Sequence, residues 1–401
     1  MPNPPIEIKT LLKEADQCVL CGMCLSSCPT YLKTRDEGES PRGRISLLVA
    51  LARQELPPSP RLRAHVEHCL TCRACERMCP AETPYGRIID TGRALLLQKA
   101  PPSLVSRLFR HVLLKKLLPS AQWLRGLGWA LYLAQRTGLT YLAPLVGLGR
   151  LARLLPRVLP PRLFQPYYPA HGILRGRVAL FTGCVASIAD RNTLESALRV
   201  LTGLGYDVDI PPSQVCCGAL HLHTGDPKGA QTLARQNQLA FSGSWDAILS
   251  TASGCGATLI EQLPIEDISA FLTRITWPTE VSFLPLQKRV AVHDPCSLSN
   301  VLRCAEAPYF LLQRIPGLTI LRLSGHCCGA GGAHLLRSSH LSQSLLTDKI
   351  KTLQGLSPDI LATSNIGCAL HLRSGIRGPK PEILHPITLL ARQMILPTRS
   401  K

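Results

Sequence analysis

The chain has 401 residues, enough for two or three domains with buried cores, and 45% of the residues are hydrophobic, which excludes a mainly disordered chain. Lys and Arg outnumber Asp and Glu by 45 to 26, so nucleic acid, an anionic membrane and an acidic partner protein all have to be considered. The first residues lack the apolar core of a secretory signal, and we therefore expect a cytoplasmic protein. In that reducing compartment, seventeen cysteines indicate metal or cluster ligation rather than disulfides.

Eight of these cysteines lie in two runs of one pattern near the N-terminus. Both runs are C-x2-C-x2-C-x3-C-P, the spacing that ligates [4Fe–4S] clusters in bacterial-type ferredoxins, whereas zinc sites rarely use a doubled run. Three cysteines on a tight loop can direct their thiolates at one cluster, while the fourth, before proline, is turned toward the other cluster. The predicted ligands are Cys18, Cys21, Cys24 and Cys79 for the first cluster, and Cys69, Cys72, Cys75 and Cys28 for the second.

The connection between the two runs is helical in pattern. Ile45, Leu48 and Val49 recur at helical spacing, which predicts a helical form of the two-cluster module over residues 1–100. Arg42 and Arg44 follow the first run. They either balance the negative charge of a thiolate-ligated cluster or face solvent near a helix start.

The next segment is basic and contains no acidic residue. From Thr91 to Ala189 there are fourteen Lys or Arg residues and no Asp or Glu. Leucines recur at helical spacing in LVSRLFRHVLLKKLL and LVGLGRLARLLPRVL, which predicts basic amphipathic helices able to lie in a membrane interface. Arginines interrupt the apolar runs, so no transmembrane helix is expected. We assign residues 101–172 to a helical linker that contacts either a membrane or a partner protein, and we expect no nucleic-acid partner because no nucleic-acid motif accompanies the charge.

The remainder of the chain is an internal repeat. RVALFTGC corresponds to RVAVHDPC, both copies contain a Cys-Cys-Gly triplet, and a third cysteine follows in each. Matched cysteines are separated by 112, 111 and 113 residues, by subtraction of their positions. The eight matched cysteines are Cys184, Cys216, Cys217 and Cys255 in the first copy and Cys296, Cys327, Cys328 and Cys368 in the second. The repeat predicts a duplicated domain over residues 173–283 and 284–396.

Within each copy, short apolar strands alternate with helical patterns. We expect strands at 177–181, 206–210 and 246–253 and helices at 192–205 and 227–241 in the first copy, with strands at 318–323 and 359–365 and helices at 309–315 and 342–353 in the second. Such alternation predicts a parallel sheet whose cysteines follow the carboxyl ends of strands, where α/β sheets bind ligands. The cysteines therefore form a candidate redox site, with inert buried thiols as the alternative. The predicted fold class is α+β overall: a helical ferredoxin-like domain with two [4Fe–4S] clusters, followed by a duplicated α/β domain with parallel sheets.

The paired ferredoxin runs, SPRGRI and the two CCG triplets resemble the cysteine-rich CCG proteins, which include heterodisulfide reductase subunits and the electron-transfer subunit of anaerobic glycerol-3-phosphate dehydrogenase. CLTCRACERMCP, TASGCGA, HCCGAGG and NIGCALHL most resemble the glycolate oxidase iron–sulfur subunits, over about residues 10 to 390. The resemblance implies a complex with FAD-binding glycolate oxidase subunits that oxidise glycolate to glyoxylate. This chain would carry electrons to quinone or another acceptor at the inner face of the cell membrane, and it would hold no catalytic residue.

One departure from the CCG pattern bears on the repeats. The repeat of the heterodisulfide reductase type ends in C-x-x-C and holds a noncubane cluster with five cysteines, but Thr258 and His371 stand at the last positions here. A cubane cluster, or an altered site that uses His371, therefore stays open. The missing fifth cysteine favours an electron-transfer subunit over a thiol or disulfide reductase, and a lactate or glycerol-3-phosphate dehydrogenase is the alternative complex. Cys304 has no counterpart in the first copy and is predicted to be structural.

Overall fold

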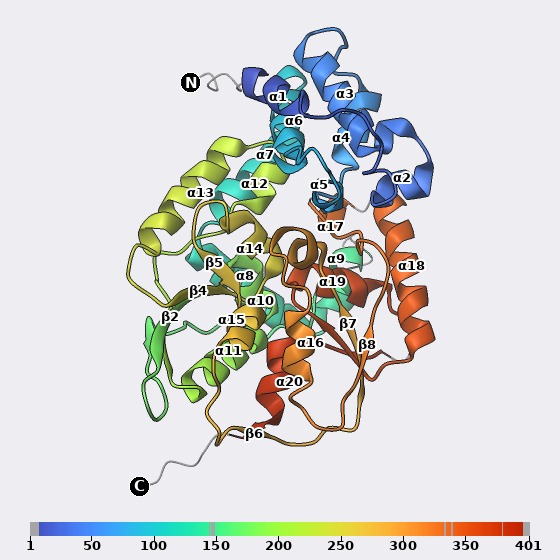
Figure 1. Cartoon of the computed structure of the whole chain (residues 1–401). Coiled ribbons are helices and arrows are strands. Elements are labelled where there is room, and N and C mark those ends of the chain that lie inside the picture. The colour runs from blue at the N-terminus through green and yellow to red at the C-terminus, as the bar shows by residue number, and fades with distance from the viewer. Residues whose placement is uncertain are drawn as a thin grey trace. The chain divides into compact units, whose positions relative to one another are not determined.

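The structure is a computed structural model that describes residues 8–143, 145, 149–332, 334–337, 340–378 and 380–395 (Figure 1). The chain divides into two compact units. The first, here called the ferredoxin unit, consists of Met1–Lys115, Gly218–Thr232 and His326–Leu346, and the second, the sheet unit, consists of Lys116–Cys217, Leu233–Gly325 and Thr347–Lys401. Three separate parts of the sequence thus build each unit, and the domain boundaries given above stay a prediction.

The described part of the ferredoxin unit is helical. Its elements are α1 (Ile8–Ala15), α2 (Pro29–Thr34), the 3-10 helix η1 (Glu37–Glu39), α3 (Pro41–Ala52), α4 (Pro60–Glu67), α5 (Ala74–Arg77), α6 (Tyr85–Lys99), α7 (Leu104–Arg110), α12 (Ala219–His223) and α17 (His334–Arg337). Ser40 and Ser59 cap α3 and α4, each followed by proline at the first helical position, where no amide hydrogen bond is lost. Leu48, Leu51 and Ile88 fill the core between these helices.

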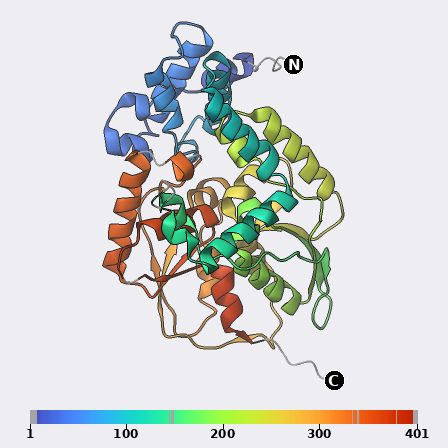
Figure 2. The same ribbon diagram turned by 180° about the vertical axis from the view of Figure 1, so that it is seen from behind.

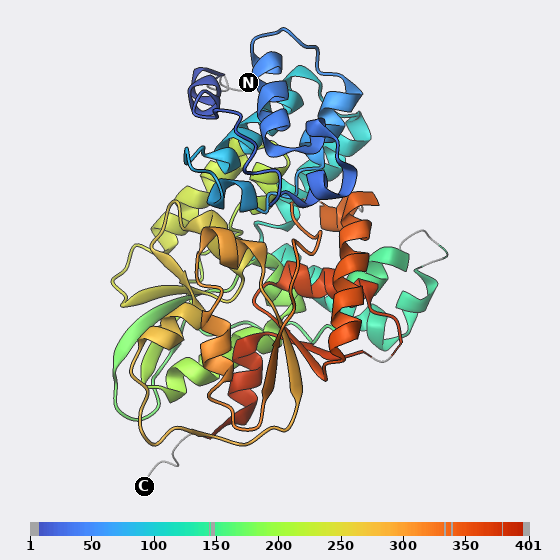
Figure 3. The same cartoon turned by 45° about the vertical axis from the view of Figure 1, so that its right-hand side comes forward.

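The sheet unit contains two parallel sheets of the same topology (Figure 3). The first has the order β1-β3-β2-β4-β5 and the second β10-β9-β7-β8, so β3-β2-β4-β5 corresponds to β8-β7-β9-β10. The strands are β1 (Tyr167–Tyr168), β2 (Gly176–Phe181), β3 (Tyr206–Asp209), β4 (Ala247–Ser250), β5 (Ile265–Asp267), β7 (Arg289–His293), β8 (Thr319–Arg322), β9 (Ile360–Thr363) and β10 (Glu382–Leu384), with β6 (Ser282–Phe283) paired to β11 (Met394–Ile395). Among the described strands of these two larger sheets, β1 alone pairs antiparallel with its neighbour, and all other pairs are parallel. The predicted fold class is confirmed.

Helices of the two copies pack on each other and share one core. The helices that lie wholly within the sheet unit are α8 (Ala121–Arg136), η3 (Leu139–Leu142) and α9 (Gly149–Leu154) of the linker, and α10 (Cys184–Ala189), α11 (Arg191–Gly203), α14 (Ser253–Leu259), α15 (Ile268–Arg274), the π-helix η4 (Ser297–Val301), α16 (Ala307–Leu312), α19 (Ile366–Gly375) and α20 (Pro386–Gln393) of the copies. α11 packs on α20 and α15 on α16, and Val178 and Val290 of the two central strands belong to one hydrophobic cluster. The duplicated halves therefore bury a common interior.

Three helices continue across the division between the units: η2 (His111–Leu117), α13 (Pro227–Ala240) and α18 (His340–Leu356). α7 and η2 form the first predicted amphipathic segment. The second is helical only over α9, and residues 146–148 of it lie outside the described residues. In the part of the chain that the structure describes, no helix is both long and apolar enough to cross a membrane.

The expected strand 246–253 is shorter in the structure. β4 ends at Ser250, whose hydroxyl oxygen accepts a hydrogen bond from the amide of Ala252 at 3.1 Å and turns the chain into α14. Serine competes with the backbone for hydrogen bonds in this way, and a short apolar run does not show where a strand gives way to a helix.

The buried carboxyl of Asp267 makes the stability of the fold depend on pH. It is buried and caps α15, accepting a hydrogen bond from the amide of Ser269 at 2.8 Å, and burial raises the pKa of Asp267 to about 6. Because the folded-state pKa lies above the unfolded value, the protonated carboxyl favours folding at low pH and this stability is lost as pH rises through about 6.

Asp267→Asn keeps a capping oxygen and cannot ionise. We expect the free energy of unfolding of the variant, relative to that of the wild type, to increase by about 1 kcal/mol between pH 5 and pH 8. Urea unfolding followed by circular dichroism at both pH values measures this difference. If the difference in free energy of unfolding between variant and wild type is the same at both pH values, the pKa of Asp267 is not raised by burial.

Candidate iron–sulfur centres

The two ferredoxin runs have the same backbone conformation. Leu20 and Thr71, at equivalent positions, have positive φ angles of 57° and 50°, and Gly22 and Arg73 follow with 85° and 54°. Alternating left-handed residues wind each loop tightly, as the cysteine spacing predicts. Three non-glycine residues accept this strained conformation, which indicates that the loop geometry is held by the surrounding structure.

A cavity lies within the ferredoxin unit, and its empty space of about 290 Å³ includes volume that is open to solvent. Its lining includes the three cysteines of the second run that were predicted to share a cluster, together with the fourth cysteine of the first run. These four are Cys28, Cys69, Cys72 and Cys75. Burial and the neighbouring thiols raise the pKa of Cys75 far above its usual range. Convergent thiols around a cavity fit a cluster with cationic iron.

The same cavity is lined by Arg44, which is almost fully buried. Its Nη2 lies 2.6 Å from Oε2 of Glu39, and its Nε donates to the carbonyl of His65 at 2.6 Å. Oε1 of Glu39 in turn lies 2.8 Å from Nδ1 of both His65 and His68. Arg44 is thus a buried cation beside the predicted cluster ligands, and the solvent-facing alternative is wrong for this residue.

Two hydroxyl groups complete the surroundings of this cavity. The hydroxyl of Tyr85 donates to Sγ of Cys69 at 3.5 Å, and Oγ1 of Thr30 lies 3.3 Å from Sγ of Cys28. Nη2 of Arg44 also donates to Oγ1 of Thr30 at 3.1 Å. Hydrogen bonds to sulfur tune a cluster and orient its ligands. The sequence offered no pattern that identified Thr30 or Tyr85.

The predicted ligands of the first cluster are more accessible. Cys21 is exposed, and burial together with the neighbouring Cys18 raises the pKa of Cys24. Arg42 is partly exposed and donates from Nη1 to the carbonyl of Leu20 at 2.9 Å. Arg42 therefore stabilises the loop of the first run.

Cys79 lies in a turn of its own beside Thr83. Partial burial acts to raise the pKa of Cys79, but the hydroxyl of Thr83, 3.4 Å from Sγ, and amides of the turn lower it overall. A thiol with a lowered pKa suits a metal ligand. The assignment of Cys79 to the first cluster still rests on the sequence pattern.

The first CCG copy brings its four cysteines together within the sheet unit. The thiol of Cys184 donates to Sγ of Cys216 at 3.5 Å, and the thiol of Cys217 is hydrogen-bonded with those of Cys216 and Cys255. Hydrogen bonding to Cys216 and burial raise the pKa of Cys184 well above its ordinary value. Cys184 and Cys255 follow β2 and β4, so the predicted position beyond the strand ends is confirmed.

Asn237 holds the Cys-Cys segment of this copy in place. Asn237 is fully buried, its Nδ2 donates to the carbonyl of Cys216 at 3.1 Å, and its Oδ1 accepts from the amide of Val215 at 2.9 Å. Sequence reasoning missed this residue. A polar side chain within the predicted helix 227–241 was the available signal.

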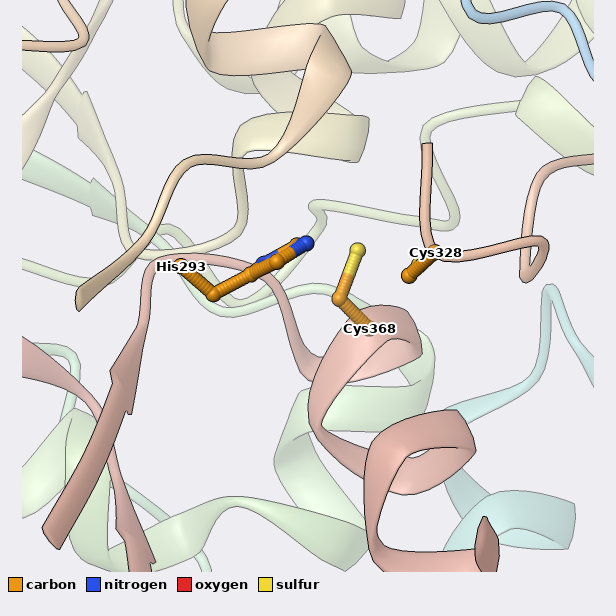
Figure 4. A group of neighbouring side chains, drawn as sticks. All are labelled: His293, Cys328 and Cys368. Carbon is orange, nitrogen blue, oxygen red and sulfur yellow. The ribbon is translucent and has the colours of Figure 1, made fainter. Parts of the chain in front are cut away.

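In the second copy, His293 joins Cys368. Both are buried in the sheet unit, and their ligand atoms lie within 4.8 Å of each other (Figure 4). Burial lowers the pKa of His293 to about 3, so its imidazole is neutral and able to bind a metal. His371 is also fully buried on α19. The sequence pattern did not identify His293 as a ligand, because the first copy has Phe181, which cannot bind a metal, at the equivalent position.

The other cysteines of the second copy belong to different units. Cys296 lies at the start of η4 in the sheet unit. Cys327 and Cys328 belong to the ferredoxin unit, where Gly329, with φ of 91°, donates from its amide to Sγ of Cys327 at 3.4 Å. The local CCG turn thus directs a backbone amide at sulfur, as expected for a ligand loop.

Comparison with known families identifies the dicluster module, the linker and both CCG copies. Residues 14–83 match the 4Fe-4S dicluster domain, and residues 178–260 and 290–373 match the cysteine-rich CCG domain. Residues 105–160 match the linker region of the glycolate oxidase iron–sulfur subunit. The dicluster and cysteine-rich domains indicate [4Fe–4S] clusters as the cofactors.

Known relatives resemble the chain over most of its length. The probable glycolate oxidase iron–sulfur subunit of Bacillus subtilis is 31% identical over 92% of this chain and 91% of its own, and the Escherichia coli glycolate oxidase iron–sulfur subunit is 30% identical over 90% of both. Lactate utilization protein A of Bacillus cytotoxicus is 24% identical over 52% of this chain and 96% of its own. With its dicluster motifs, its linker and its two CCG copies, the chain belongs to the family of glycolate oxidase iron–sulfur subunits.

Proposed function

We propose that this iron–sulfur protein is the electron-transfer subunit of a flavin-dependent glycolate dehydrogenase. FAD-binding partner subunits would oxidise glycolate to glyoxylate, and this chain would pass the electrons to quinone or another acceptor. The observation that carries the proposal is the cavity that is lined by Cys28, Cys69, Cys72 and Cys75, a set of thiols that fits a redox centre. The match to the glycolate oxidase linker over residues 105–160 supports glycolate rather than lactate.

The residues around the cavity fit a one-electron carrier. A [4Fe–4S] cluster supplies reversible one-electron transfer when bound. The cation of Arg44 lines the cavity and favours the more negative, reduced state, while the hydroxyl of Tyr85 donates to Sγ of Cys69 and stabilises thiolate charge. The chain thus tunes and orients the carrier, and substrate chemistry belongs to the flavoprotein.

Purification with and without the flavoprotein subunits tests this function. Glycolate should bleach the cluster absorbance of the complex within the time of one turnover, whereas the chain alone should turn over no glycolate and be reduced only by dithionite. Glycolate oxidation by the flavin-free chain would contradict the proposal. So would a complex whose clusters remain oxidised in excess glycolate.

We also propose that the fourth cysteine of each run serves the opposite cluster. Cys28→Ser should then damage the cluster of the second run, and Cys79→Ser that of the first. Electron paramagnetic resonance of the dithionite-reduced variants measures which of two signals is lost. Cys69→Ser and Cys18→Ser identify which signal belongs to the cluster of the second run and which to that of the first. If Cys28→Ser loses the same signal as Cys18→Ser, each fourth cysteine serves the cluster of its own run and the proposal is wrong.

We infer that the CCG copies hold a further redox centre between the ferredoxin clusters and the acceptor. A chain of four hydrogen-bonded thiols in the first copy and the neutral His293 beside Cys368 in the second support this role. These residues could ligate either a cubane cluster or an altered site with a histidine ligand.

Cys217→Ser should abolish glycolate-dependent reduction of the acceptor while the ferredoxin clusters stay reducible by dithionite. Cys328→Ser tests the second copy in the same way. Cys304→Ser is the control, because burial raises the pKa of Cys304 to about 12 and keeps this unmatched thiol protonated. Full acceptor reduction by both CCG variants would show that the copies are a scaffold.

For localisation, we propose peripheral attachment to the inner face of the cell membrane through α8 (Figure 2). Leu124 and Gly128 of α8 are buried, whereas Trp123, Trp129 and Leu133 are 64%, 43% and 53% exposed. Exposed tryptophans on a helix within a segment that carries fourteen basic and no acidic residues suit the headgroup region of an anionic bilayer. The sequence patterns pointed to the neighbouring segments and missed α8.

Replacement of Trp129 and Leu133 by Glu should release the protein from vesicles that contain anionic lipid, because the apolar face can no longer enter the interface. Sedimentation with such vesicles measures binding, and Arg125→Glu with Arg136→Glu should weaken it mainly at low salt, where charge attraction is unscreened. Phe310→Glu, at another exposed apolar position of the sheet unit (59% exposed), is the control. If the Trp129 and Leu133 variant still binds the vesicles, or if it loses flavoprotein binding rather than vesicle binding, the exposed face of α8 contacts a protein and not the membrane.

A further inference from the structure

The two cysteine runs fold alike but differ in exposure. Val19, which follows the first cysteine of its run, is 70% exposed, whereas Leu70 at the equivalent position of the second run is 2% exposed. Cys21 is exposed, while its counterpart Cys72 is partly buried and lines the cavity. The same motif is therefore used once at the surface and once in the interior.

Apolar side chains surround the exposed thiol in sequence. Leu20 and Met23 are 53% and 52% exposed, and with Val19 they occupy most of the positions between Cys18 and Cys24. Leu20 is kept in the left-handed conformation while Arg42 donates to its carbonyl. Exposed apolar side chains on a fixed loop indicate a contact surface, because their exposure to water is unfavourable and the backbone conformation is specific.

The charge of this region selects the class of partner. Four basic side chains between residues 8 and 35 are exposed, namely Lys9, Lys13, Lys33 and Arg35. The exposed acidic side chains nearby are Asp16 and Glu37, and Glu37 is paired with Arg42 at 2.7 Å, while Glu14 is buried and paired with Arg87. The stretch of chain that carries the apolar loop thus has more exposed basic than acidic side chains, which is complementary to a protein face with an apolar centre and an acidic rim.

We propose that the loop of Val19, Leu20 and Met23 is the docking surface for the electron-donating flavoprotein, which delivers electrons to the first cluster. The inference rests on the proposed function, since it requires that Cys21 ligates a cluster. Electron transfer requires close approach of the donor to the cluster, and the exposed thiol of Cys21 lies in this loop. Each transfer moves one electron from reduced flavin to the cluster, and after two transfers the flavin is oxidised and has released two protons.

The second cluster is then an interior relay. Cys28, Cys69 and Cys75 are buried, and Arg44 stands beside them. A partner protein that approaches from solvent meets the ligands of the first cluster before those of the second. The exposure difference between Val19 and Leu70 thus assigns an order to two clusters whose motifs are identical in spacing.

Val19→Glu in the full chain, purified with its clusters and mixed with the separately purified flavoprotein subunits, tests the docking surface. We expect the flavoprotein dissociation constant, measured by isothermal titration calorimetry, to rise at least about tenfold, as for a central interface residue. Reduction of the clusters by glycolate should slow accordingly in stopped-flow absorbance, with dithionite reduction unchanged. Leu239→Glu is the matched control, an equally exposed leucine on α13 in the sheet unit (76% exposed), and it should bind as wild type.

Met23→Gln is a milder second variant that removes apolar surface without adding charge and should weaken binding in the same direction. Arg35→Glu should weaken binding at low salt and lose its effect at high salt. If wild-type clusters are not reduced by glycolate and flavoprotein, the proposed function itself fails. If they are, and Val19→Glu binds and is reduced as fast as wild type, the docking surface is wrong. Loss of anionic-vesicle binding by Val19→Glu with flavoprotein binding intact would also overturn it.

Discussion

A buried arginine is the constraint on which the ferredoxin unit depends. Arg44 lies almost without solvent contact beside four predicted cluster ligands, and desolvation of its charge is costly unless partners surround it. Glu39 is that partner, itself held between His65 and His68, and Thr30 connects the guanidinium to Cys28. Buried ion pairs contribute little to stability compared with apolar packing, so the retention of this one is better explained by the anionic, thiolate-ligated group that it faces.

Duplication gave the sheet unit two copies with one topology and different chemistry. The strand order β3-β2-β4-β5 recurs as β8-β7-β9-β10, because the same alternation of strands and helices folds in the same way twice. The ends of these strands nevertheless carry different ligand types: four thiols converge after the strands of the first copy, and an imidazole joins a thiol in the second. Under the proposed function, the two copies would offer a redox centre different donor atoms, and different donor atoms give a centre different electron affinities.

The sequence allowed prediction of those features that local spacing determines. The cysteine runs predicted the tight loops and the meeting of Cys28 with the second run, and the strand and helix periods predicted both parallel sheets. The burial of Arg44, the role of Asn237 and the approach of His293 to Cys368 could not be predicted, because tertiary packing decides which polar side chains are enclosed. The exposed face of α8 was missed for the same reason, because the sequence of an apolar helix does not show which of its side chains other elements cover.

The ferredoxin unit is discontinuous in sequence, and this has consequences for how the protein can be made and divided. Met1–Lys115 is only one of its three segments, and Gly218–Thr232 and His326–Leu346 come from within the two CCG copies. Gly331 of the last segment packs so closely on the carbonyl of Leu70 that no side chain fits there. A gene fragment that stops after the dicluster motifs would leave that carbonyl and its loop uncovered. Synthesis on the ribosome reaches residue 346 before the first-made module has all its parts, so its completion is coupled to that of the repeats.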